Sequence, residues 1–85
     1  MSFSSSRKRA LDTSRPIAYR ASSARSCAVC VSEKYRVNRS VILEQVRQQT
    51  HVDLNAVDNS DGILKAISAL EHIKLNGLNK PLHTI

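Results

Sequence analysis

The sequence predicts a mainly α protein, with a small module of two to three helices at about residues 33–77 behind a disordered basic N-terminal arm. The module is predicted by apolar residues that recur at helical spacing over residues 61–76 and again over residues 40–50. The arm is predicted by composition, because residues 1–26 are rich in Ser and Arg and poor in apolar side chains. We therefore divide the chain into an arm, 1–26, and a helical module with an extended C-terminal tail, 27–85.

The arm contains eight Ser, and Pro16 interrupts any helix that begins at Ala10-Leu11. Three roles remain open for it: a solvated tail, a nucleic-acid-binding arm or nuclear import signal centred on residues 7–9, and an organelle transit peptide. Its candidates for nucleic-acid contact are Arg7, Lys8, Arg9, Arg15, Arg20 and Arg25.

Residues 28–37 are ambiguous. Apolar and polar residues alternate from Val29 to Val37, which indicates a short β element. Val31 and Tyr35 also share a face if the segment is helical. We favour a helix beginning near Glu33, because no hairpin partner follows.

Residues 40–50 are predicted to form a helix, with Ser40 as its cap and with Ile42 and Val46 on its apolar face. Glu44 and Arg47 are spaced to pair across one turn of this helix. Residues 51–57 alternate apolar and polar side chains, which suits a short β element or an extended connection that buries Val52 and Leu54. Because the segment is short and has no clear partner strand, we favour a connector or one short helical turn.

The longest helix is predicted from residue 58 to residue 77. Asp58, Ser60 and Asp61 suit its first turn, and Gly77 suits its end. Its core-facing stripe contains Ile63, Ala66, Ile67, Leu70 and Ile73. Leu64 and Leu75 form a second apolar edge, and we expect them to be partner-docking residues. In the tail, Leu78, Leu82 and Ile85 are expected to fold back onto the helices.

The positive charge is concentrated in the first half of the chain. Residues 1–40 contain nine basic and two acidic residues, a net charge of +7, whereas residues 41–85 contain four basic and five acidic residues, a net charge of −1. Such a segment suits a polyanion. Beyond the arm, the basic residues placed to contact phosphate are Arg36, Arg39 and Arg47. Asp58 and Asp61 would repel phosphates from the start of the longest helix, so that helix is a poor DNA-reading helix.

The residues that could carry chemistry are sparse. Cys27 and Cys30 have the spacing of half a zinc site, but the three His are isolated, so we predict no metal, no cofactor and no enzymatic activity. No small-molecule substrate is evident. The chain contains no apolar run of the roughly 18–20 residues that span a bilayer, and no secretory signal follows Met1. Two cysteines three positions apart suit a reducing compartment.

The sequence therefore favours a non-enzymatic binding protein of the nucleus or cytoplasm. Its arm would contact nucleic acid electrostatically, while its helical module would mediate self-association or dock a protein, because a folded part of roughly 50–55 residues is marginal alone. The alternative is a helical adaptor or complex subunit with an organelle-targeting N-terminal segment, which would place it in the mitochondrion.

Overall fold

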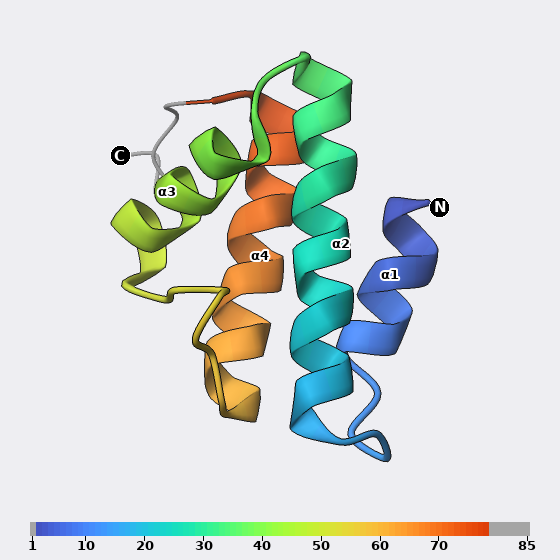
Figure 1. The fold of residues 1–85 in the computed structure, drawn as a ribbon. Coiled ribbons are helices and arrows are strands. Elements are labelled where there is room, and N and C mark those ends of the chain that lie inside the picture. The colour runs from blue at the N-terminus through green and yellow to red at the C-terminus, as the bar shows by residue number, and fades with distance from the viewer. Residues whose placement is uncertain (1, 79–85) are drawn as a thin grey trace.

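A computed structural model describes residues 2–78 of the chain, and this part contains four helices and no strand (Figure 1). The helices are α1 (Phe3–Ala10), α2 (Ile17–Tyr35), α3 (Arg39–Thr50) and α4 (Ser60–Asn76). The protein is thus mainly helical, as predicted, with one or two helices more than expected. The short β elements considered near 28–37 and 51–57 are not formed.

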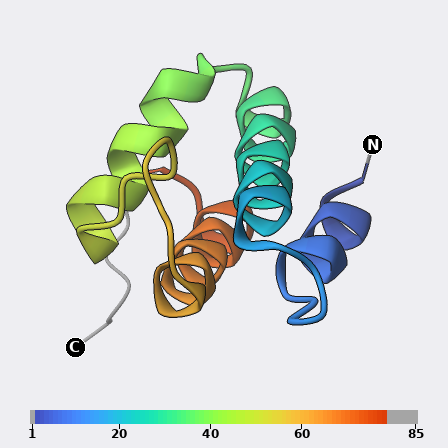
Figure 2. The same cartoon turned by 60° about the horizontal axis from the view of Figure 1, so that its bottom comes forward.

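Helices α2 and α4 lie side by side and run in the same direction, with α1 on one side of this pair and α3 on the other (Figure 2). Hydrogen bonds join the pair at both ends. Arg20 Nη2 donates to Ser60 Oγ at 3.0 Å near the two N-termini. Near the two C-termini, the Tyr35 hydroxyl lies 2.8 Å from the carbonyl oxygens of both Ile73 and Lys74, which share its one donated proton. The register between α2 and α4 is therefore fixed at two points.

Helix α4 closely matches its prediction. The residues expected on its core-facing stripe are all at most 2 % exposed. Its N-cap is Asn59, whose side-chain oxygen accepts a hydrogen bond from the Gly62 N–H at 2.7 Å, rather than Asp58, Ser60 or Asp61. It ends at Gly77, where φ is +93° and the N–H donates to the Ile73 carbonyl oxygen at 2.8 Å.

The largest difference between the sequence-based prediction and the structure is helix α2. It is continuous from Ile17 to Tyr35, so it crosses the proposed boundary between residues 26 and 27, and most of the expected disordered arm is helical. Its buried stripe consists mainly of small residues, which a search for bulky apolar side chains overlooks: Ala21, Ala24, Cys27, Ala28 and Val31. Small side chains let neighbouring helices approach closely and pack densely.

The end of α2 also differs from expectation. Arg36 adopts the left-handed conformation (φ 55°, ψ 43°), and Val37 donates its N–H to the Ser32 carbonyl oxygen at 3.0 Å. This bonding pattern ends a helix by satisfying its last carbonyl groups. A helix therefore does not begin near Glu33. Glu33 lies in the last turn of α2, and the chain turns at residues 36–38 before α3 begins.

Helix α1 is capped by Ser2, whose hydroxyl accepts a hydrogen bond from the Ser5 N–H at 3.2 Å. Phe3 and Ala10 bury their side chains at its two ends. Pro16 lies at the N-cap position of α2 and so begins a helix, although the sequence suggested that it only interrupts one. Proline is tolerated there because the first N–H groups of a helix have no intrahelical partner.

Helix α3 buries Ile42 and Val46, as predicted, and its N-cap position is Asn38 rather than Ser40. The segment from residue 51 to residue 59 is a connector that buries Leu54. Leu78 packs at the edge of the core, whereas Leu82 and Ile85 lie outside the described residues. None of the helices within residues 2–78 has the length and apolar character required to cross a membrane.

Candidate nucleic-acid interface

Arg20 is a structural residue, although the sequence placed it among the residues that contact nucleic acid. It is only 3 % exposed. Its Nε donates to the Ala10 carbonyl oxygen at 2.8 Å, and its Nη2 donates to Ser60 Oγ. A cation at the C-terminal end of α1 satisfies a carbonyl group that has no intrahelical partner and complements the helix dipole. Arg20 therefore joins three helices and presents no charge for a ligand.

Two other arm candidates, Arg25 and Arg7, are also bound within the fold. Arg25 is half-buried, and its Nη1 donates to the Leu54 carbonyl oxygen at 2.9 Å. Arg7 pairs with Glu71, which ties α1 to α4. Both partners of that pair remain partly exposed, so the pair adds only a small amount of stability, about 0–1 kcal/mol.

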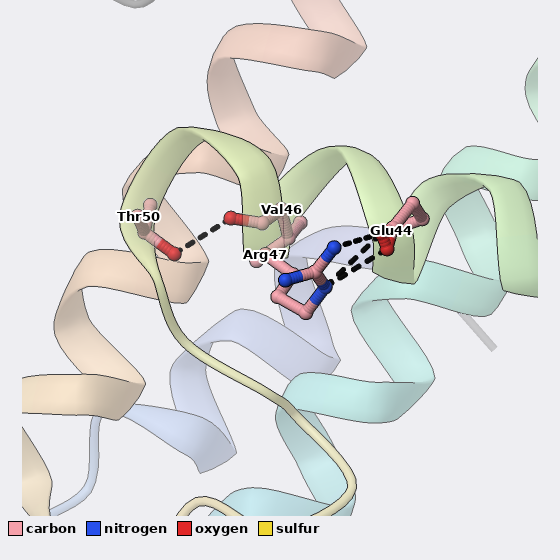
Figure 3. A network of polar contacts seen from close by, with 4 residues as sticks. All are labelled: Glu44, Val46, Arg47 and Thr50. Atoms are coloured by element: carbon pink, nitrogen blue, oxygen red, sulfur yellow. Dashed lines mark hydrogen bonds and ion pairs between the residues drawn. The ribbon is translucent and has the colours of Figure 1, made fainter.

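Arg47 pairs with Glu44 on the surface of α3, as their spacing predicted (Figure 3). Its Nε lies 2.8 Å from Glu44 Oε1. This hydrogen bond and the nearby positive charge hold the pKa of the Glu44 carboxyl below its usual value. In the next turn of the same helix, the Thr50 hydroxyl donates to the Val46 carbonyl oxygen at 2.7 Å. Arg47 is exposed, but its charge is largely balanced by Glu44.

The remaining arm candidates, Lys8, Arg9 and Arg15, line a single groove between the last turn of α1 and the first turn of α2. We call it the α1–α2 groove; its volume is about 600 Å³, and its lining is completed by Asp12 and Tyr19. The Arg15 guanidinium carbon lies 5.3 Å from the centre of the Tyr19 ring, and Tyr19 is 40 % exposed. The groove thus combines three cations with an exposed aromatic ring, one face of which is covered by the Arg15 guanidinium.

Asp12 is the one acidic residue that lines the α1–α2 groove, and it organises the turn between the two helices. Its Oδ1 accepts hydrogen bonds from the Ser14 hydroxyl at 2.6 Å and from the Ser14 N–H at 3.0 Å. These bonds, together with the charge of Arg15, lower the pKa of the Asp12 carboxyl. With Asp12 ionised, the lining residues carry a net charge of +2, which favours an anionic ligand.

Arg36 and Arg39 are exposed and lie at the opposite end of α2. Since α2 has 19 residues, about 28 Å of helix separates this pair from the α1–α2 groove. The fold therefore brings together three of the nine predicted contact residues, buries or pairs four others, and places two at a distance. Of the three in the groove, Arg15 is also paired with Asp12, with 3.6 Å between Arg15 Nε and Asp12 Oδ2.

The docking candidates on α4 are both exposed, Leu64 by 50 % and Leu75 by 79 %. They lie three turns apart on one face, but charged residues share that face. Glu71 pairs with Arg7, and Lys65 Nζ lies 3.2 Å from Asp61 Oδ2. The two leucines are therefore separate exposed positions rather than a continuous apolar edge, and their docking role stays a prediction.

The cysteines have the character of packing residues. Cys27 is fully buried, and burial raises the pKa of its thiol to about 12. Such a thiol is protonated at neutral pH and is a poor nucleophile or metal ligand. Within residues 2–78, no three His, Cys, Asp or Glu side chains gather closely enough to hold a metal ion.

Tyr19 and Asp12 are the lining residues that sequence reasoning did not identify. Arg15 lies in the turn before α2, and Tyr19 lies in the first turn of that helix, so no helical spacing relates the two residues. Their contact depends on the turn between α1 and α2, which the sequence-based prediction of a disordered arm did not include.

Comparisons of the chain with protein-family models, with curated proteins and with solved structures give no match.

Proposed function

We propose that this protein is a non-enzymatic nucleic-acid-binding protein whose contact surface is the α1–α2 groove. The observation that carries the proposal is the convergence of Lys8, Arg9 and Arg15 on one concave surface beside the exposed ring of Tyr19. Cations that neutralise phosphates supply most of the affinity in non-specific nucleic-acid binding. Binding is therefore weak in sequence preference and strongly dependent on salt.

As expected from the sequence, basic residues of the N-terminal segment would bind phosphates electrostatically. In this proposal they do so from a groove between two folded helices and not from a disordered arm. A disordered arm folds on binding and offers all its cations, whereas a groove built from two packed helices offers only those that point into it. Arg20 and Arg25 are excluded because they bond to backbone or side-chain groups of the fold. Lys8, Arg9 and Arg15 remain as the contact residues.

The alternative of an organelle-targeting segment is weaker on structural grounds. Removal of residues 1–26 would delete α1 and the first half of α2, including the buried side chains of Phe3, Ala10, Ala21 and Ala24. The adaptor function retains support from the exposure of Leu64 and Leu75. The expectation of self-association loses one of its reasons, because the core draws on residues from Phe3 to Ile73 rather than on a small C-terminal module.

The proposal is tested by paired double substitutions that remove the same charge. Lys8→Gln/Arg9→Gln removes two cations from the α1–α2 groove, and Arg36→Asn/Arg39→Gln removes two exposed cations from the other end of α2. Asn is chosen at position 36 because that residue adopts φ 55°. Affinity for a fluorescein-labelled 12-nucleotide oligo(dT) is measured by anisotropy from 50 to 200 mM NaCl.

We expect the groove variant to reduce the slope of log affinity against log salt by about 1.4, since each phosphate contact on a single strand contributes about 0.7. The variant at the far end should leave the slope close to that of the unmodified protein. Equal losses in the two variants would show that only net charge matters, and the groove would then have no special role.

A further inference from the structure

We infer that the α1–α2 groove takes single-stranded nucleic acid, with one base stacked on Tyr19 and the adjoining phosphates held by Lys8, Arg9 and Arg15; this inference rests on the proposed function. The first observation is the state of Tyr19. Its side chain is 40 % exposed and lines the groove. The chain has only two Tyr, one Phe and no Trp, so an exposed ring beside three cations is a distinctive feature of this surface.

The other aromatic residues are engaged in the fold. The Tyr35 hydroxyl bonds to two carbonyl oxygens at the end of α4. Phe3 is 8 % exposed, and Lys74 Nζ lies 4.8 Å from the centre of its ring. Tyr19 is the most exposed of the three aromatic rings within residues 2–78, and the Arg15 guanidinium lies over one face of it. Aromatic side chains beside a cationic groove form the platforms on which single-stranded nucleic acids stack their bases.

The shape of the surface favours a single strand over a duplex. In a duplex the bases are stacked on each other, and a protein reads them by inserting a helix or a β-ribbon into the major groove. Here Lys8, Arg9 and Arg15 line a concavity of about 600 Å³ rather than a projecting helix face. That volume lies in the range of small-ligand sites, roughly 300–1,000 Å³, and so suits one unstacked nucleotide.

Arg15 links the two kinds of contact. Its guanidinium lies over one face of the Tyr19 ring, 5.3 Å from the ring centre, and its Nε lies 3.6 Å from the Asp12 carboxylate. A base would therefore stack on the opposite face of the ring, with Arg15 close enough to hold the adjoining phosphate. Lys8 and Arg9 continue the positive surface along α1. Three cations correspond to a bound segment on the order of three nucleotides, at about one phosphate per cation.

The test separates the contribution of the bases to binding affinity from that of the sugar-phosphate backbone. Three 12-mers carry the same label: oligo(dT), an abasic oligodeoxynucleotide with the same sugar-phosphate backbone, and an oligo(dA)·oligo(dT) duplex. Each is titrated with the unmodified protein, with Tyr19→Ala, with Tyr19→Phe and with Lys8→Gln/Arg9→Gln. Val41→Ala is the matched control, because Val41 is 45 % exposed and lies on α3, away from the groove lining. Far-UV circular dichroism checks that each variant is folded.

We expect oligo(dT) to bind more tightly than the abasic strand by about 5- to 150-fold, the range that stacking of one base provides. Tyr19→Ala should remove this difference, while Tyr19→Phe and Val41→Ala should retain it. Unlabelled oligo(dT) should also quench the Tyr fluorescence of the unmodified protein. Quenching should be lost in Tyr19→Phe, in which Tyr35 is the remaining Tyr.

Three results would overturn the inference but not the proposed function, provided that Lys8→Gln/Arg9→Gln weakens binding. They are equal affinity for oligo(dT) and the abasic strand, tighter binding of the duplex than of oligo(dT), and unchanged affinity of Tyr19→Ala for oligo(dT). If none of the three 12-mers binds, or if Lys8→Gln/Arg9→Gln changes nothing, the proposed function fails and the inference fails with it.

Discussion

Arg20→Met tests the role of the buried arginine in holding α1, α2 and α4 together. Methionine keeps an unbranched apolar stem in the same space but removes the donors to the Ala10 carbonyl oxygen and to Ser60 Oγ. A hydrogen bond that involves a charged group contributes about 1.5–3 kcal/mol. Two such bonds give about 3–6 kcal/mol, and the lower end applies because methionine avoids the cost of burying a guanidinium.

We therefore expect Arg20→Met to lower the free energy of unfolding by about 3 kcal/mol. For a domain of 60–100 residues, each kcal/mol corresponds to a shift of about 4–8 °C in Tm, so the midpoint should fall by roughly 12–24 °C. Urea titration and thermal melting, both followed by circular dichroism, measure the two quantities. Ser60→Ala and the double variant complete a cycle, in which a positive coupling energy identifies the Arg20–Ser60 bond.

Arg9→Met is the control, because Arg9 is only half-buried and lines the α1–α2 groove. It should change the free energy of unfolding by less than about 0.5 kcal/mol, as is usual for surface substitutions. The reasoning is refuted if Arg20→Met melts within a few degrees of the unmodified protein. It is also refuted if that variant keeps its Tm but loses affinity for oligo(dT), because Arg20 would then act as a ligand contact.

Two further predictions concern packing. Gly62→Ala should lower the free energy of unfolding by about 1 kcal/mol, as measured by urea titration, because a Cβ at Gly62 would lie 2.7 Å from Val57 Cγ2. The cost of overpacking, about 1–3 kcal/mol, exceeds the gain in helix propensity of about 1 kcal/mol. A variant that is more stable than the unmodified protein would contradict this. The pKa of Cys27 is raised from 9.0 to about 12, so the unfolded state releases this proton first and stability should fall as the pH rises from about 9 to about 12. Cys27→Ala should weaken this alkaline loss, and a Cys27 thiol that reacts with a maleimide as fast as an unfolded one would refute its burial.

The second half of the fold could be predicted from the sequence because local signals and packing agree there. In α4 the bulky side chains recur at helical spacing, and Gly77 marks the end. In α3 the buried residues Ile42 and Val46 follow the same rule. Only the capping residues were displaced by one or two positions, because Asn59 and Ser60 are both good caps and the sequence does not distinguish them.

The first half could not be predicted, because its helices are stabilised by contacts between distant residues. The stripe of Ala and Cys on α2 buries little apolar surface per residue, so it has no strong periodic signal. It packs because α1 and α4 lie close against it, and Arg20 bonds to residues 10 and 40 positions away. Composition alone indicates disorder for such a segment, and tertiary packing overrides that indication.

The candidate site depends on the same contacts, since the sequence does not indicate which arginine is buried. Arg15 and Arg20 belong to the same Ser- and Arg-rich segment, yet Arg20 is buried and Arg15 lines the α1–α2 groove. The groove exists only while α1 is docked, because Lys8 and Arg9 belong to α1 and Tyr19 belongs to α2. Arg20, which bonds to the last residue of α1, therefore stabilises the docked position of α1 on which the groove depends. Below its lowered Tm, Arg20→Met should bind oligo(dT) with the affinity of the unmodified protein. As the temperature rises through that Tm, its affinity for oligo(dT) and its helical circular dichroism signal should be lost together.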